Sequence, residues 1–205
     1  MTNYVVVGYH TPDLLYMESA GRLKASLSRF KIPHYIEEVP SKGSWYANTN
    51  YKPTFLKAML QKFFPANIVY VDCDAEFKKY PKLFDNFPGD VGVYIFDRAE
   101  YGKNNKGTEV LSGTIYLRSN DKVSAILNLW EEECTKNPLV WDQKNLEKIL
   151  NGYYTLLPGE YCKIFDRMKH IKNPVIVHYQ ASRKIKNKHK ESGRVLSKQG
   201  FLPLK

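Results

Sequence analysis

Two aspartates separated by one residue, Asp72 and Asp74, follow a short apolar run at residues 68–71. Such a run is typical of a buried strand in a parallel sheet. Ligands of open α/β sheets bind at the carboxyl ends of the strands, where these two side chains would lie. Side chains at positions i and i+2 of a strand share one face, about 6.6 Å apart. One divalent ion, or an ion and a ribose hydroxyl, fits between them, and a cation would relieve the repulsion between the two carboxylates.

Two other interpretations of this pair stay open. The first is a strand that simply ends in solvated acids. The second is the Asp-x-Asp of phosphatases that resemble haloacid dehalogenases, in which the first aspartate is a phosphorylated nucleophile. That family expects Thr or Val four residues after the first aspartate, where this chain has Glu76, and its motif usually opens the domain. A metal–diphosphate site therefore explains the pattern best.

The composition describes a globular protein. A chain of 205 residues with 43% hydrophobic and 14% aromatic residues can bury a core as one domain and is not disordered. No apolar run has the length that crosses a bilayer, and the amino terminus has no signal-peptide pattern. The three cysteines are widely spaced, which argues against a disulfide framework and a structural zinc site. We expect a cytoplasmic protein, in the host cytoplasm if the chain is of phage origin.

Positive charge is concentrated at the end of the chain. The net charge is +10, but residues 183–205 contain eight Lys/Arg and one Glu, so they contribute +7 and residues 1–182 contribute +3. We therefore expect one domain at residues 1–182 followed by a basic tail at 183–205. A basic segment indicates a polyanionic partner, such as nucleic acid, or serves solubility.

Hydrophobic periodicity predicts an α/β fold. The expected strands are residues 4–8, 32–39, 68–71, 90–96, 111–117, 153–157 and 174–179, and the expected helices are 13–30 and those beginning near 52, 120 and 142. Thr11 followed by Pro12 suggests the cap of the first helix. The first strand lacks a Gly-rich fingerprint, so dinucleotide binding is not indicated. We expect a polar loop at 41–51 and a long loop at 97–109, which is a lid, an acceptor contact or a plain connector.

Four candidate residues each have a structural alternative. Lys52 begins a helix, where an anion would offset its unfavourable interaction with the helix dipole; the alternative is a surface lysine. Asp142 opens another helix and either caps it or acts in catalysis. His178 ends a late strand as a metal ligand or a structural residue. Tyr9 either stacks on a base or packs in the core.

In combination these motifs resemble a glycosyltransferase of the GT-A fold, similar to the nucleotide-diphospho-sugar transferases of glycosyltransferase families 8 and 77. The matching pieces lie in the family's order across residues 4–184: Gly8-Tyr9, Lys52-Pro53, Asp72-Cys73-Asp74, Ser112-Gly113-Thr114, Trp141-Asp142-Gln143 and Val177-His178-Tyr179. The resemblance implies a single-domain, Rossmann-like α/β fold with a mixed, mainly parallel sheet flanked by helices.

The resemblance also implies site residues. Asp72, Asp74 and His178 would bind Mn²⁺ or Mg²⁺, although the spacing after His178 departs from the pattern of family 8. Asp142 and Gln143 would be catalytic, with retention of anomeric configuration. The donor, a nucleotide sugar and expected to be a UDP-sugar, would contact Gly8, Tyr9, Thr11, Lys52, Asp72, Ser112, Gly113, Arg183 and Lys184.

The acceptor is less defined by the sequence. The basic tail suits a polyanion, for example a hydroxymethylated base in phage-type DNA, while a glycan or lipid-linked acceptor is the alternative. Two other functions stay open: a non-catalytic nucleic-acid-binding module that acts through the tail, and a phosphatase or nucleotidyltransferase on a related scaffold.

Overall fold

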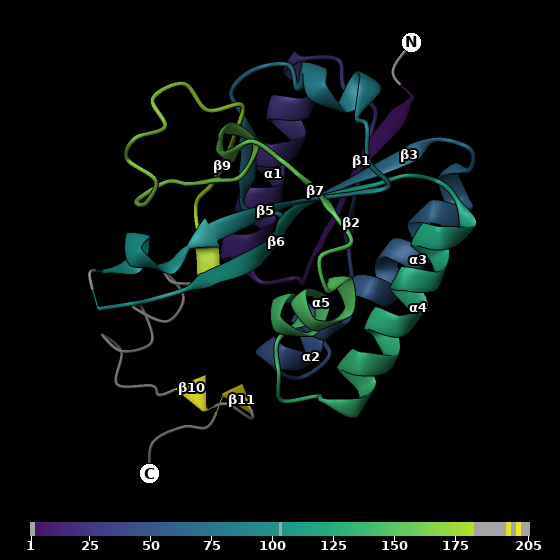
Figure 1. Cartoon of the computed structure of the whole chain (residues 1–205), viewed down its shortest axis with the longest axis vertical. Coiled ribbons are helices and arrows are strands. Elements are labelled where there is room, and N and C mark those ends of the chain that lie inside the picture. The colour runs from purple at the N-terminus through teal and green to yellow at the C-terminus, as the bar shows by residue number, and fades with distance from the viewer. Residues whose placement is uncertain (1–2, 103, 183–195, 198–199, 202–205) are drawn as a thin grey trace.

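The computed structural model describes residues 3–102, 104–182, 196–197 and 200–201. Its centre is a six-stranded sheet with the strand order β2-β1-β3-β6-β5-β7 (Figure 1). Strand β6 is antiparallel to both of its neighbours, and the other strands run in one direction. The expected mixed, mainly parallel sheet is therefore confirmed. The strands are β1 (Tyr4–His10), β2 (His34–Glu38), β3 (Asn67–Val71), β5 (Val91–Asp97), β6 (Thr108–Leu117) and β7 (Thr155–Leu156).

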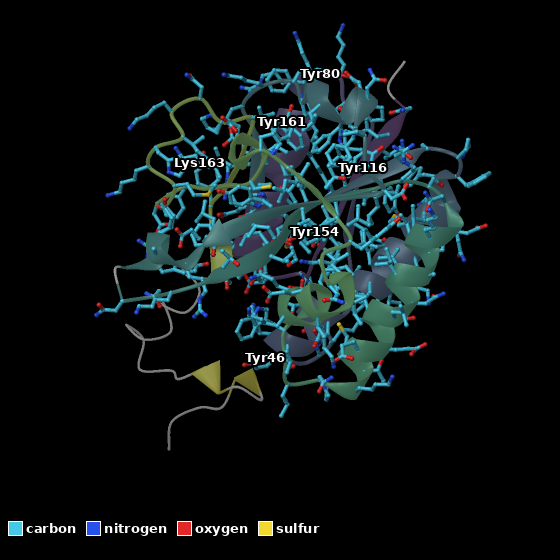
Figure 2. The ribbon with its side chains drawn as sticks, viewed as in Figure 1. Tyr46, Tyr80, Tyr116, Tyr154, Tyr161 and Lys163 are labelled. Carbon is cyan, nitrogen blue, oxygen red and sulfur yellow. The ribbon has the colours of Figure 1, made fainter. Side chains whose placement is uncertain are left out.

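Helices cover both faces of the sheet (Figure 1). Helix α1 (Leu14–Arg29) lies on one face together with the three-stranded sheet β4-β9-β8. Helices α3 (Lys52–Phe63), α4 (Asp121–Lys136) and α5 (Asp142–Leu150) pack on the other face, with the short helix α2 (Trp45–Asn50) beside them. Each face has its own apolar core, and Figure 2 shows side chains filling the space between sheet and helices on both sides.

The smaller elements connect these layers. They are β4 (Ala75–Phe77), β8 (Lys163–Ile164), β9 (Ile176–His178), the 3-10 helices η1 (Lys82–Asn86), η2 (Arg98–Tyr101) and η3 (Gly159–Tyr161), and the antiparallel pair β10 (Leu196–Ser197) and β11 (Gly200–Phe201). Strand β4 follows directly after β3, and it pairs with β9 so that Ala75 lies opposite His178. This pairing brings two distant parts of the sequence together at the carboxyl end of β3.

Three local expectations are corrected. Helix α1 is capped by Asp13, whose carboxylate accepts a hydrogen bond from the backbone nitrogen of Leu15, and not by Thr11. The expected loop at 41–51 contains α2, because Ser44 caps it by accepting a hydrogen bond from the backbone nitrogen of Ala47. The expected loop at 97–109 is shorter and spans 98–107, because β5 ends at Asp97 and β6 begins at Thr108, and η2 occupies its first part.

Gly8 explains how β1 approaches β3 so closely. A Cβ atom at this position would lie 2.6 Å from the carbonyl oxygen of Val71, which is backbone and cannot move aside cheaply. Gly8 is buried inside β1 and is needed for strand packing. Among the described residues, no helix has the length and hydropathy that a membrane span requires.

Candidate functional site

A cavity of about 440 Å³ opens at the carboxyl ends of β1 and β3. Its walls come from the ends of these strands, the start of β6, α2, the first turns of α3 and α5, and the turn after β9. This is the edge at which open α/β sheets bind ligands. The predicted site residues that line it are Tyr9, Thr11, Lys52, Asp72, Asp74, Ser112, Asp142 and Gln143.

The two aspartates line the cavity and have different partners. Asp72 follows β3, and its Oδ1 accepts a hydrogen bond of 2.9 Å from the hydroxyl of Tyr70. Oδ2 of Asp74 accepts a hydrogen bond of 2.8 Å from the backbone nitrogen of Ala181. The second oxygen of Asp74, Oδ1, lies 3.7 Å from Nδ1 of His178. Both carboxylates are therefore held by neighbouring groups, while the side chain of Asp72 is 41% exposed and that of Asp74 is 14% exposed.

Lys52 is the central cation of the site. Its Nζ lies 2.7 Å from Oδ2 of Asp142 and 3.3 Å from Oδ1 of Asp72, and it donates to the carbonyl and the hydroxyl of Ser112, each at 3.1 Å. The residue is only 3% exposed, so the alternative of a surface lysine is wrong. Burial opposes the charged form, but Asp142 and Asp72 outweigh it and raise the pKa of Lys52 above its usual value.

Asp142 is not a helix cap. Trp141 occupies the cap position of α5 without a side-chain hydrogen bond, and the buried carboxylate of Asp142 instead accepts from Lys52 and from the hydroxyl of Ser112, the latter at 2.8 Å. The indole of Trp130 donates to the backbone carbonyl of Asp142 at 2.9 Å. Oε1 of Gln143 accepts from the backbone nitrogen of Ser112 at 3.4 Å. The start of α5 is thereby fixed against β6 with its carboxylate facing the cavity.

The buried His178 lies beside the two aspartates with one nitrogen unpaired. Its Nε2 is 2.8 Å from Oγ1 of Thr114, and that hydroxyl also donates to the carbonyl oxygen of Tyr161 at 3.1 Å. A hydroxyl has one proton, and a carbonyl can only accept; Thr114 therefore accepts from Nε2–H, which leaves a lone pair on Nδ1. Nδ1 is buried and has no hydrogen-bond partner among the described residues.

This arrangement fits a divalent metal ion. A Cβ atom at Gly113 would lie 3.2 Å from Oδ2 of Asp72 and 3.4 Å from Nδ1 of His178, so these two atoms border the same small space. A lone pair that faces a carboxylate is unfavourable, and a cation between the two groups would relieve the repulsion. Within the described residues, no three acidic, histidine or cysteine side chains are already grouped as a metal site. Two carboxylates and one imidazole are an incomplete ligand set, typical of ions that take further ligands from a phosphate substrate.

The other predicted residues are placed as follows. Tyr9 lines the cavity, but its ring packs on Tyr51, Phe55 and Tyr70 and its hydroxyl donates to the carbonyl of Asn48 at 2.7 Å, which favours the packing role. Gly8 and Gly113 are absent from the cavity wall, although Gly113 borders the space between Asp72 and His178. Arg183 and Lys184, like most of the expected tail, lie outside the described residues.

Several cavity residues were not predicted as site residues. Glu109 and Arg98 come from the β5–β6 hairpin, and Trp45 and Trp141 come from α2 and the cap of α5. Glu109 is the last residue of the loop that the sequence predicts at 97–109. Its burial depends on the hairpin, which the periodicity of the sequence does not reveal.

Comparison with known proteins gives a consistent result. A model of the family described as nucleotide-diphospho-sugar transferase matches residues 28–191. A glycosyltransferase involved in the glycosylation of the major capsid of PBCV-1 is similar in structure, with a TM-score of 0.66 and 16% identity over 92% of this chain and 98% of that chain. The apo form of the glycosyltransferase GlyE from Streptococcus pneumoniae TIGR4 has a TM-score of 0.59 and 15% identity, over 87% of this chain but only 55% of that chain. At these identities the likeness shows the fold alone. No curated protein matches in sequence.

Proposed function

We propose, from the premise that this chain belongs to the nucleotide-diphospho-sugar transferase family, that it is a metal-dependent glycosyltransferase that uses a UDP-sugar as its donor. The assignment to families 8 and 77 stays a prediction. One observation carries the metal-dependent part of the proposal: the unpaired Nδ1 of His178 faces Asp74 and shares a small space with Asp72.

Asp72, Asp74 and His178 are the residues that would hold the ion. Carboxylate oxygens with a single imidazole suit Mn²⁺ or Mg²⁺ better than Zn²⁺, which prefers closed sites of nitrogen and sulfur ligands. A divalent ion bound there would neutralise the negative charge that develops on the departing nucleotide diphosphate. Thr114 supports this role, because its hydroxyl fixes the tautomer of His178 that leaves Nδ1 free to bind.

The sugar end of the donor is assigned to Asp142, Gln143 and Ser112, which lie together beside the aspartates. Oδ2 of Asp142 is bound to Lys52 and Ser112, and its second oxygen is the candidate to orient sugar hydroxyls or to stabilise positive charge at the anomeric carbon. Lys52 holds two carboxylates at a fixed distance and contributes positive charge near the leaving group. Arg183 and Lys184 stay candidates for further donor contacts. We expect the reaction to retain anomeric configuration.

Two observations bear on the alternative functions. A phosphatase would use the first aspartate as a nucleophile, whereas Oδ1 of Asp72 is bound to Tyr70 and to Lys52. A nucleic-acid-binding module or a DNA acceptor would depend on the basic tail, which lies largely outside the described residues. Hydroxymethylated DNA, a glycan and a lipid-linked sugar are therefore all to be included as acceptors in an assay.

Calorimetric titration of nucleotide sugars in the presence and absence of Mn²⁺ tests the proposal. We expect a UDP-sugar to bind only with the metal, and Asp74→Asn to weaken this binding at least ten-fold. Asp121→Asn, a change in the first turn of α4 away from the cavity, is the matched control and should bind like the wild type. Hydrolysis of p-nitrophenyl phosphate without any binding of nucleotide sugars would support the phosphatase instead.

A further inference from the structure

We infer that the cavity region between Glu109 on the hairpin and the rings of Trp45 and Trp141 binds the acceptor, and that this acceptor is an uncharged saccharide. The inference rests on the proposed function, because an acceptor site presupposes a donor. It assigns to Glu109 the role of accepting hydrogen bonds from acceptor hydroxyls, and to the two indole rings that of packing against the apolar face of a sugar ring.

Glu109 is a buried carboxylate that the fold does not use. Glu109 is 7% exposed and lines the cavity. Within the described part of the chain, its side chain forms no hydrogen bond or ion pair, in contrast to the buried Glu133, which is paired with Lys148 and Asn137. The carboxylate oxygens of Glu109 are not among the fully buried atoms that lack a partner, so they are accessible from the cavity, where a ligand can donate hydrogen bonds to them.

The position of Glu109 separates it from the donor site. It precedes Ser112 by three residues on β6, a separation of about 10 Å along an extended strand. The cluster of Lys52, Asp142 and Ser112 is internally paired, so it does not supply donors to Glu109. A second ligand that lies beyond the donor sugar would be within reach of this carboxylate.

The two indole rings provide apolar surface at the same cavity. Trp45 is 39% exposed and Trp141 is 36% exposed, and both line the cavity. Their elements are adjacent, because Asn50 of α2 donates a hydrogen bond of 3.0 Å to the backbone carbonyl of Val140, next to Trp141. Figure 1 shows α2 beside α5. Binding sites for small neutral ligands combine such rings with a few polar groups.

Charge distinguishes a saccharide from a nucleic acid. The cavity wall contains the carboxylates of Asp72, Asp74, Glu109 and Asp142 but, among the described residues, only Lys52 and Arg98 as cations. Lys52 is already bound to two of the carboxylates. Counting the described residues alone, an ion and a diphosphate would leave the wall without surplus positive charge, and Glu109 would repel a phosphodiester. Sugar hydroxyls, in contrast, donate hydrogen bonds to a carboxylate, and two adjacent hydroxyls can bind its two oxygens.

The test uses the chain of 205 residues with Mn²⁺ and the donor that calorimetry identifies. Transfer is measured to methyl glycosides of glucose, galactose, mannose and N-acetylglucosamine, to lactose and maltose, and to hydroxymethylated duplex DNA. We expect transfer to at least one saccharide. Glu109→Gln and Trp141→Ala should raise its KM at least ten-fold while the dissociation constant of the donor changes less than two-fold. Trp141→Phe, which keeps an aromatic ring, should recover most of the loss.

Matched controls are a carboxylate and an aromatic ring outside the cavity. Glu38→Gln at the end of β2 and Phe64→Ala, whose residue is 73% exposed, should leave KM and donor binding unchanged. The inference is overturned if Glu109→Gln leaves the KM of every saccharide within two-fold of the wild type. Transfer to hydroxymethylated DNA alone, or no transfer to any saccharide while the donor still binds, would also overturn it. Failure of every nucleotide sugar to bind would instead overturn the proposed function, and the acceptor site with it.

Discussion

Nζ of Lys52 lies 2.7 Å from Oδ2 of Asp142, and neither side chain is more than 5% exposed. The two residues come from the first turns of α3 and α5, so this ion pair joins two helices at the cavity. Asp72 lies on the other side of the same nitrogen, 3.3 Å away. The buried cation of Lys52 therefore positions both Asp72, near the proposed metal, and Asp142, near the proposed sugar.

Replacing Lys52 with methionine should destabilise the protein and abolish sugar transfer. The carboxylate of Asp142 would remain buried without its cation, and loss of one partner of a buried pair costs about 3–5 kcal/mol. Urea unfolding monitored by circular dichroism measures the loss. The double variant Lys52→Met/Asp142→Leu should be more stable than Lys52→Met, because it removes the buried carboxylate of Asp142. The other partner of Lys52, Asp72, has a side chain that is 41% exposed, so water can solvate it. Equal stability of the two variants would contradict this account of the pair.

The partners of Lys52 also show what sequence reasoning can reach. The sequence indicated a functional lysine at the start of a helix, because a cation there is disfavoured unless an anion lies nearby. The anions are Asp142 and Asp72, which come from distant parts of the chain. Only the packing of α3 and α5 against the sheet brings them to Lys52, and no local pattern encodes that.

In the fold, too, local sequence patterns predict the main elements, whereas contacts between distant parts of the chain depend on packing. The main strands and helices follow from hydrophobic periodicity. Asp72, Asp74 and His178 gather because β4, which follows β3 in the chain, pairs with β9. Helix α2 was missed, because it has six residues, none of them is buried, and no apolar periodicity marks it. Glu109 was missed as a cavity residue, because its burial depends on the pairing of Glu109 with Phe96 across the hairpin.

Thr114→Val should weaken Mn²⁺ binding about 10–100-fold, the usual effect of removing a hydrogen bond to a metal-binding histidine. Without the hydroxyl, Nε2 of His178 loses its partner, and the ring is free to carry its proton on Nδ1 instead. Thr114→Ser keeps the hydroxyl and should bind Mn²⁺ like the wild type. Calorimetry with Mn²⁺ and UDP provides the measurement. Equal affinity of the valine and serine variants would show that Thr114 does not position His178.

Gly113→Ala should also lower the affinity for Mn²⁺ while the protein stays folded. The new Cβ atom would occupy the space bordered by Asp72 and His178, at 3.2–3.4 Å from their side-chain atoms. Gly21→Ala is the matched control, because a Cβ atom in that helix meets nothing within 4 Å and should stabilise the protein by about 0.5–1 kcal/mol. Unchanged Mn²⁺ affinity of Gly113→Ala would place the metal elsewhere.

Glu131 should give the protein a pH-dependent part of its stability. Hydrogen bonds from Lys57 and then Thr54 lower the pKa of Glu131 below its ordinary value of 4.5. The folded state therefore favours the ionised form, so this stabilisation is present above about pH 4.5 and is lost as the pH falls through the lowered pKa. Because both side chains of the ion pair are about one-third exposed, it contributes at most about 1 kcal/mol.

Glu131→Gln isolates this contribution. At pH 7 the variant should unfold at a lower urea concentration than the wild type, and the difference should shrink as the pH falls through the lowered pKa of Glu131, because the wild-type carboxyl then also becomes uncharged. Glu132→Gln is the control, since Glu132 is more exposed and its partner Lys136 lies 3.6 Å away on the same helix, so little change is expected at any pH. A difference between Glu131→Gln and the wild type that stays constant from pH 7 to pH 3 would mean that packing, and not the charge of Glu131, joins α3 to α4 at this point.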